Sequence, residues 1–368
     1  MFSRRGFNRE KGGESLTKYN EAATLKKRPN ETQRRVMMKR KVMIVCLLVT
    51  LSMSLSISLS GMATAQGAIT LKACTAHPKP HTHSLPMVWF KERVEQRSNG
   101  RITINWLGGP EVMPPTKLIE AIKGGVIDLF NCPGAYYRSA VPEIGSLLKF
   151  VPGTPAEARE MGIYDFWNEF ANKKANAFFL GKPQDGTFYL YLGSPGERVK
   201  RMADLRGMKL RVSPQYEAFC KALGAVPIQM PGGEIYTALE RGVVDGFYWP
   251  DTGIKTWKGL IKYRIAQGFY KNESTMLVNL DTWNGIPKEM QKLMIDVVKE
   301  IEREIVPVRE KGAQEEQREH MAVGMKLVEF PPDDTKAFVD LAYKAAWEEV
   351  ERDLGADFAA RARKVFGY

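Results

Sequence analysis

The sequence predicts an α/β protein whose two similar lobes face each other across a cleft. One pattern occurs twice, because residues 121–130 (AIKGGVIDLF) return as residues 238–247 (ALERGVVDGF). In both copies a helical segment ends at glycine and continues into a short apolar run that contains aspartate. Each copy also closes a longer strand–helix–strand–helix–strand unit, so the two halves should fold alike and hold a ligand between them.

The N-terminal part of the chain has the composition of a targeting segment. Basic residues 39–41 precede an apolar run, and residues 63–65 (ATA) have the small-x-small form that a signal peptidase cleaves. We therefore interpret residues 37–65 as a signal peptide cleaved near Ala65, and residues 1–36 as a mis-assigned or non-native extension. The alternative is a permanent membrane tether, because the apolar run approaches the length that spans a bilayer.

The net charge of +12 lies mostly in this N-terminal part. Residues 1–65 carry 13 Lys and Arg and 4 Asp and Glu, which leaves 41 basic against 38 acidic residues, a net charge of +3. Since no basic tract remains, the sequence predicts no nucleic-acid partner. Cys74, Cys132 and Cys220 form no CxxC motif, and we expect them to be small buried residues, although one disulfide is an alternative.

The two units should contain the same order of elements. Alternating apolar residues, helix-stop glycines and prolines at helix starts mark their ends. In the first unit we expect strands at 69–76, 101–106 and 126–130, with helices at 84–98 and 115–123. In the second we expect strands at 208–212, 226–230 and 243–249, with helices at 214–223 and 234–241. Connections this short imply largely parallel sheets with ligands at the strand ends.

The remaining segments should connect the lobes. We expect a helix at 154–174, strands at 187–193 and 273–280 that cross between the lobes, a long helix at 287–319 containing Pro307, and helices at 333–355 and 357–365. Two crossings make a hinge about which the lobes can rotate. The predicted boundaries are 66–188 for lobe I, 189–276 for lobe II, and 277–368 for the return strand, the long connecting helix and the C-terminal helices.

Three segments resemble one protein family. Residues 90–102 (FKERVEQRSNGRI), 204–212 (DLRGMKLRV) and 221–239 are similar to segments of the solute-binding proteins of TRAP transporters, the tripartite ATP-independent periplasmic uptake systems. The resemblance covers nearly all of residues 69–310. It implies a periplasmic-binding-protein-like clamshell with a hinge and a long C-terminal helical region. It also implies a periplasmic location, cleft closure on a small carboxylate ligand, and delivery to the membrane permease subunits.

The resemblance also implies a role for Arg211, which in the family pairs with the ligand carboxylate. Its position near the end of an apolar strand supports that role, because a guanidinium can hold both carboxylate oxygens. Many relatives have Gln-Glu-Asn where this chain has Phe-Tyr-Trp, and relatives that bind 2-oxo acids share only the Trp. Phe247 and Trp249 should share one face of the strand. Such an aromatic wall favours a monocarboxylate with an apolar or aromatic body, although core packing of Phe247 is the alternative.

Four further residues are candidates for ligand contact. Tyr136 and Tyr137 follow the last strand of the first unit, Tyr191 lies on a predicted crossing strand, and His81 follows the first strand. Packing at the rim of the cleft is the alternative for each of them. The sequence does not decide between a monomer and a dimer.

Enzyme functions lack the residues that they need. His81 belongs to the sequence HPKPHTH at residues 77–83, but the only other histidine is His320 in the helical tail, so we predict no metal site. No hydrolase or phosphate-loop motif occurs, and we predict no catalytic residue and no cofactor. Asp128 and Asp245 occupy equivalent positions of the repeat, which favours a structural role. The alternatives are a ligand-sensing or membrane-tethered ectodomain and, less favoured, a metal-dependent hydrolase.

Overall fold

The computed structural model describes residues 31–32, 34–40, 43, 68–184, 186–271 and 274–368. The chain divides into two compact units, Met1–Ala65 and Gln66–Tyr368. The described residues of the first unit are helical. The rest of the predicted extension and signal peptide lies outside the described residues. No helix in the described part of the chain has the length and apolar character needed to cross a membrane.

The first lobe of the second unit is built on a five-stranded sheet with the order β2-β1-β3-β10-β4. Strand β1 runs parallel to β2 and β3, whereas β10 runs antiparallel to β3 and β4. Helices α2 and α10 cover one face of this sheet, and α3 and α6 cover the other. The strands are β1 (Ile69–Thr75), β2 (Ile102–Gly108), β3 (Leu129–Cys132), β4 (Ala177–Gly181) and β10 (Thr275–Asn279). The helices are α2 (Leu85–Arg97), α3 (Leu118–Lys123), α4 (Pro142–Gly145), α5 (Pro155–Glu160), α6 (Ile163–Ala175) and α9 (Leu280–Gly285).

The second lobe has a six-stranded sheet with the order β11-β9-β5-β8-β6-β7. Strand β6 runs parallel to β7 and β8, and β11 runs parallel to β9, but β5 is antiparallel to both of its neighbours. The repeated units therefore have the expected parallel pairing. Among the described strands, each antiparallel pair includes β5, in the second sheet, or β10, in the first. The strands are β5 (Phe188–Leu192), β6 (Lys209–Val212), β7 (Val226–Gln229), β8 (Gly246–Pro250), β9 (Tyr263–Ile265) and β11 (Lys326–Val328), with helices α7 (Glu217–Ala222) and α8 (Ile235–Glu240).

The repeated aspartates make the same contacts in both lobes. The backbone N–H of Lys72 donates to Asp128 Oδ2 at 2.8 Å, and the backbone N–H of Asp128 donates to the carbonyl of Lys72 at 2.8 Å. Asp245 repeats this exchange with Lys209, at 2.8 and 2.7 Å. Each carboxylate thus ties the start of the third strand of its unit to the first strand, which is the structural role expected from the repeat.

In the described part of the chain, three connections join the two sheets. The first two are the segments between β4 and β5 and between β9 and β10, and the third is helix α10 (Lys288–Ala322), which leads into β11. The prediction that the strand at 187–193 crosses between the lobes is wrong, because both neighbours of β5 belong to the second sheet. The crossing lies before β5.

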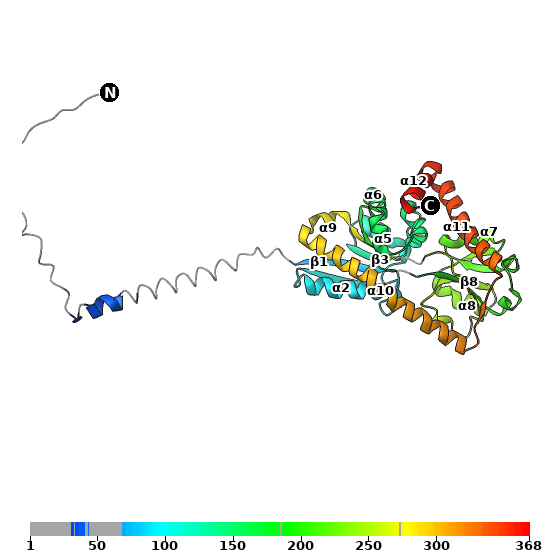
Figure 1. Cartoon of the computed structure of the whole chain (residues 1–368), viewed down its shortest axis with the longest axis horizontal. Helices are drawn as coiled ribbons and strands as arrows, with labels where there is room; N and C mark the ends of the chain where they lie inside the picture. Colours follow the sequence, from blue (N-terminus) through cyan, green and yellow to red (C-terminus); the bar gives the residue numbers. More distant parts are fainter. Residues whose placement is uncertain (1–30, 33, 41–42, 44–67, 185, 272–273) are drawn as a thin grey trace, which may run out of the picture. The chain divides into compact units, whose positions relative to one another are not determined.

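Helix α10 contacts both lobes along its length (Figure 1). On the first lobe, Arg97 of α2 forms a bidentate pair with Glu300, at 2.7 and 2.6 Å. Toward the second lobe, Arg309 donates to Asp251 at 2.7 Å. Pro307 lies inside the helix, which continues through it.

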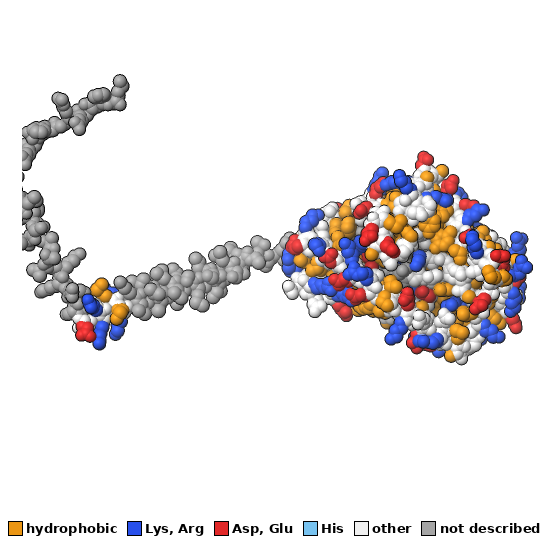
Figure 2. Space-filling model, viewed as in Figure 1, with side chains coloured by type: hydrophobic (Ala, Val, Ile, Leu, Met, Phe, Trp, Pro, Cys, Tyr) orange, Lys and Arg blue, Asp and Glu red, His pale blue; other side chains and the backbone are white. Residues whose placement is uncertain are grey.

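The C-terminal helices also span the two lobes. Helix α11 (Pro332–Leu354) packs on α7 of the second lobe, and α12 (Ala356–Phe366) packs on α6 of the first. The single helix expected at 154–174 is two helices, because Gly162 between them has a left-handed φ of 78°. On the surface, Lys and Arg side chains are interspersed with Asp and Glu (Figure 2), and no broad basic face is visible in that view.

Candidate ligand-binding cleft

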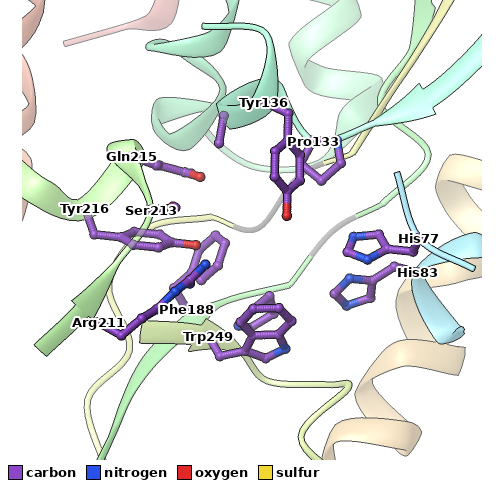
Figure 3. A pocket seen from close by; sticks show the side chains of 12 residues that line it. His77, His83, Pro133, Tyr136, Phe188, Arg211, Ser213, Gln215, Tyr216 and Trp249 are labelled. Atoms are coloured by element: carbon purple, nitrogen blue, oxygen red, sulfur yellow. The ribbon is translucent and has the colours of Figure 1, made fainter. Parts of the chain in front are cut away.

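A cavity of about 850 Å³ opens between the two lobes. A small recess of about 50 Å³ adjoins it and shares part of its wall. The shared wall contains residues of both lobes, namely His77, Ala135, Tyr136, Arg211, Ser213 and Trp249. Figure 3 shows that Arg211 and Tyr216 face His77 and His83 across this space, with Tyr136 and Trp249 between them.

Arg211 lies on strand β6 and is only 3% exposed. Its Nε donates to the carbonyl of Met230 at 3.0 Å, and it forms no ion pair with a carboxylate of the described residues. The guanidinium carbon lies 5.7 Å from the centre of the Trp249 ring. Burial lowers the pKa of Arg211, because the charged form loses hydration. The cavity wall therefore presents a desolvated cation without an anion.

Hydroxyl groups surround this cation. The Tyr136 ring extends into the cavity with its hydroxyl toward the open space (Figure 3). Burial raises the pKa of Tyr136, and the nearby charge of Arg211 opposes that shift, so the hydroxyl stays protonated and can donate. Ser213 Oγ is buried and has no hydrogen-bond partner among the described residues. Sequence reasoning missed Ser213 and Tyr216, although the position of Ser213, directly after the strand of Arg211, is a usable signal.

Trp249 lies near the end of β8 and lines both the cavity and the recess. Its ring packs edge-on against Trp257, with ring centroids 4.9 Å apart. The indole Nε1 is buried without a hydrogen-bond partner among the described residues. Trp249 therefore offers an apolar face and one unused donor to a ligand.

Three of the aromatic candidates are not brought to the cavity. Phe247 is fully buried and stacks on Tyr191, with ring centroids 5.5 Å apart. The hydroxyl of Tyr191 donates to the carbonyl of Pro250 at 3.2 Å. Tyr137 is buried and its hydroxyl bonds to that of Thr275 at 2.9 Å. Phe247 does share a sheet face with Trp249 as predicted, but it lies two residues deeper, where the helices and loops of the second lobe cover the sheet.

His81 lines the cavity, His83 lines the recess, and His77 lines both. The three rings of His77, His81 and His83 lie with centroids 4.7 to 5.0 Å apart. Burial, together with the neighbouring rings, lowers the pKa of His77 to about 3 and that of His83 well below its usual value. Burial also lowers the pKa of His81. All three imidazoles are therefore neutral at neutral pH. Counting histidines along the chain did not show that three of them converge.

A two-lobed α/β fold with a cavity between its lobes is the architecture of a protein that binds a small solute. Residues 75–353 match the family model of the bacterial extracellular solute-binding proteins, family 7, and the chain belongs to that family. The match confirms the predicted family of TRAP transporter solute-binding proteins and the two-lobed fold. These proteins are periplasmic transport receptors that bind small organic acids and work with membrane components, and the chain is not an enzyme.

Individual relatives are similar over most of the chain. A monocarboxylate 2-oxoacid-binding periplasmic protein of Nostoc sp. is 25% identical over 269 residues, which are 71% of this chain and 74% of that protein. A TRAP periplasmic solute-binding protein from Desulfovibrio salexigens with bound orotic acid has a TM-score of 0.71 and 18% identity, and the match covers 81% of this chain and 98% of that one. One from Ralstonia eutropha with bound (S)-2-acetolactate has a TM-score of 0.67 and 23% identity, with the same coverage. At these identities the two solved structures support the fold.

Proposed function

We propose that this protein is exported, is cleaved near Ala65, and binds a small monocarboxylate with an apolar or aromatic body through Arg211 in the periplasm. The lobes close on the ligand, and the closed form delivers it to the membrane permease subunits of a TRAP transporter. The signal peptide itself lies largely outside the described residues, so its cleavage belongs to the proposal.

The observation that carries this proposal is the buried guanidinium without an anion. Burying a charge costs free energy unless a partner and hydrogen bonds compensate it. Within the described residues, the carbonyl of Met230 is the one hydrogen-bond partner of Arg211, and no carboxylate pairs with it. A ligand carboxylate would supply the missing charge and accept two parallel hydrogen bonds from the guanidinium. Tyr136 and Ser213 line the same recess and would donate further hydrogen bonds to this anion.

The composition of the cavity wall supports a single carboxylate. Arg211 is the one Lys or Arg among the described residues that line the cavity and the recess, and no Asp or Glu lines either of them. The larger cavity is also bordered by Trp249, Trp257, Tyr236 and several prolines, and its uncharged polar members include His77, His81, Thr116, Gln229 and Thr256. One cation and an apolar wall suit a ligand with one charged end and an apolar body. The Nostoc relative, a monocarboxylate 2-oxoacid-binding protein, makes 2-oxo acids the first candidates.

A thermal-shift screen tests the proposal. The protein purified from the periplasm is heated with 2-oxo monocarboxylates, aromatic monocarboxylates, succinate, and the primary amide of the best acid as a matched neutral control. We expect a monocarboxylate to raise the Tm by linkage and the amide to leave it unchanged. Equal stabilisation by acid and amide would show that charge recognition at Arg211 is not the basis of binding.

N-terminal sequencing of the same preparation tests the export step. A mature chain that begins near Gln66 supports a released receptor. Retention of residues 37–65 would instead support the membrane-tethered or sensing ectodomain.

A further inference from the structure

We propose that His77, His81 and His83 form a binding site for one divalent transition-metal ion in the wall of the cleft. We further propose that an oxygen atom of the bound acid completes the coordination of this ion opposite Arg211. The second step rests on the proposed function, whereas the first does not.

The three side chains lie close enough together to be candidates for one metal site. Their candidate ligand atoms all lie within 4.8 Å of one another. Ligand nitrogens about 2.1 Å from a tetrahedral ion are about 3.4 Å apart, so the rings, two of which are stacked, must turn toward a common point when they bind an ion. Three neutral imidazoles without a carboxylate suit zinc, copper or nickel ions, whereas calcium and magnesium require oxygen ligands.

The backbone that carries the histidines is held in place by its own contacts. The hydroxyl of Thr75 donates to the carbonyl of His77 at 2.7 Å. Ser84 Oγ donates to the carbonyls of His77 and Pro78, at 3.1 and 2.9 Å. Two prolines restrict the loop further, since each fixes its own φ. The site is therefore organised before any ion arrives, which reduces the entropy lost on binding.

Contacts of the rings leave nitrogen atoms for the ion. His81 Nδ1 accepts the backbone N–H of His83 at 3.1 Å, so Nε2 of His81 remains as its ligand atom. His83 Nε2 lies 3.4 Å from Thr252 Oγ1, which in turn accepts a hydrogen bond from Arg309. A hydroxyl beside a ligating histidine is the kind of neighbour that fixes the ring orientation in metal sites.

The fourth coordination position opens to the ligand cavity. His77 and His81 both line that cavity together with Arg211. In Figure 3, His77 and His83 stand across the recess from Arg211. Three protein ligands and one open position are the arrangement in which zinc binds an exchangeable oxygen ligand. The 2-oxo oxygen of a 2-oxo acid can take this position while Arg211 holds both oxygens of the carboxylate.

A calorimetric titration of the tag-free, chelator-treated chain with Zn²⁺ tests the metal site. We expect one ion per chain, and we expect His81→Gln and His77→Gln each to lower the affinity by about 100-fold or more. His320→Gln is the matched control, because His320 is the chain's other histidine and lies in α10 outside the cluster. The Tm of each variant shows whether it is folded. His77 and His81 are both half-buried, so glutamine at either position should leave the chain folded.

Failure of the metal site, failure of the shared coordination and failure of the proposed function give different results in these titrations. Absence of Zn²⁺ binding, undiminished binding in folded His81→Gln, or equal binding of Ca²⁺ overturns the metal site. Titrations of pyruvate with and without saturating Zn²⁺ test the second step, for which we expect at least a tenfold gain in affinity. Equal pyruvate affinity in both titrations overturns the shared coordination alone. Failure of every acid to bind overturns the proposed function, while the Zn²⁺ titration still decides the metal site.

Discussion

Substitution of Arg211 by methionine isolates the charge that we assign to ligand capture. Methionine keeps the length and apolar contacts of the side chain but removes every donor. A charge-assisted hydrogen bond contributes roughly 1.5–3 kcal/mol, so losing two should cost about 3–6 kcal/mol of binding free energy. This corresponds to a Kd about 10² to 10⁴ times higher. The Tm without ligand should stay equal or rise, because a buried cation without an anion is removed.

The assay is isothermal titration calorimetry with the best acid from the thermal-shift screen. Arg264→Met is the matched control, since Arg264 is also buried, at 7% exposure. It packs over the ring of Tyr189 at 4.3 Å and lines neither the cavity nor the recess. We expect this control to lower the Tm and to leave the Kd within about twofold. Retention of acid affinity within threefold in folded Arg211→Met would refute the reasoning, and so would equal losses in both variants.

Three further predictions concern the cleft wall, the repeat and the long helix. Trp249→Asn should raise the Kd for aromatic and apolar monocarboxylates more than that for succinate, as measured by calorimetry, because the lost contact is apolar; equal losses would contradict the proposed substrate class. Asp245→Ala should lower the free energy of unfolding by about 1–2 kcal/mol in urea denaturation, since the backbone N–H of Lys209 loses its acceptor, and Asp128→Ala should cost a similar amount. Burial lowers the pKa of His320 below 6.5, so the folded state disfavours its protonated form. The contribution of neutral His320 to the free energy of unfolding should be fully present above about pH 6.5 and should decrease as the pH falls below it. The Tm measured against pH should therefore fall less steeply in His320→Gln, and an unchanged slope would contradict this.

The repeated pattern predicted the fold well because it marks both the end of a helix and the pairing of the strand that follows it. A helix-ending glycine, an apolar run and an aspartate recur where two strands of one unit must be joined. The contacts of Asp128 and Asp245 show why, since each ties the third strand to the first. Strands β9 and β11 escaped prediction because three residues are too short for an alternating pattern. Strand β4 escaped because it directly follows a helix and is buried on both faces.

The sequence could predict those site residues that reach the cavity because they lie near the end of a strand. Arg211 and Trp249 lie near strand ends and reach the cavity, whereas Phe247 lies two residues deeper and packs in the core. Alternation identifies the face of a strand but not the depth along it. The histidine cluster was out of reach for another reason. Its geometry depends on the contacts of Thr75 and Ser84 with the loop backbone, which no periodic pattern encodes.

Helix α10 affects how the two lobes can move relative to each other. In its first half, Glu300 pairs with Arg97 of the first lobe, and in its second half Arg309 pairs with Asp251 of the second lobe. Pro307 stands between these anchors and lacks the N–H that would complete the backbone ladder. We therefore expect this helix to bend most readily at Pro307 when one lobe rotates against the other.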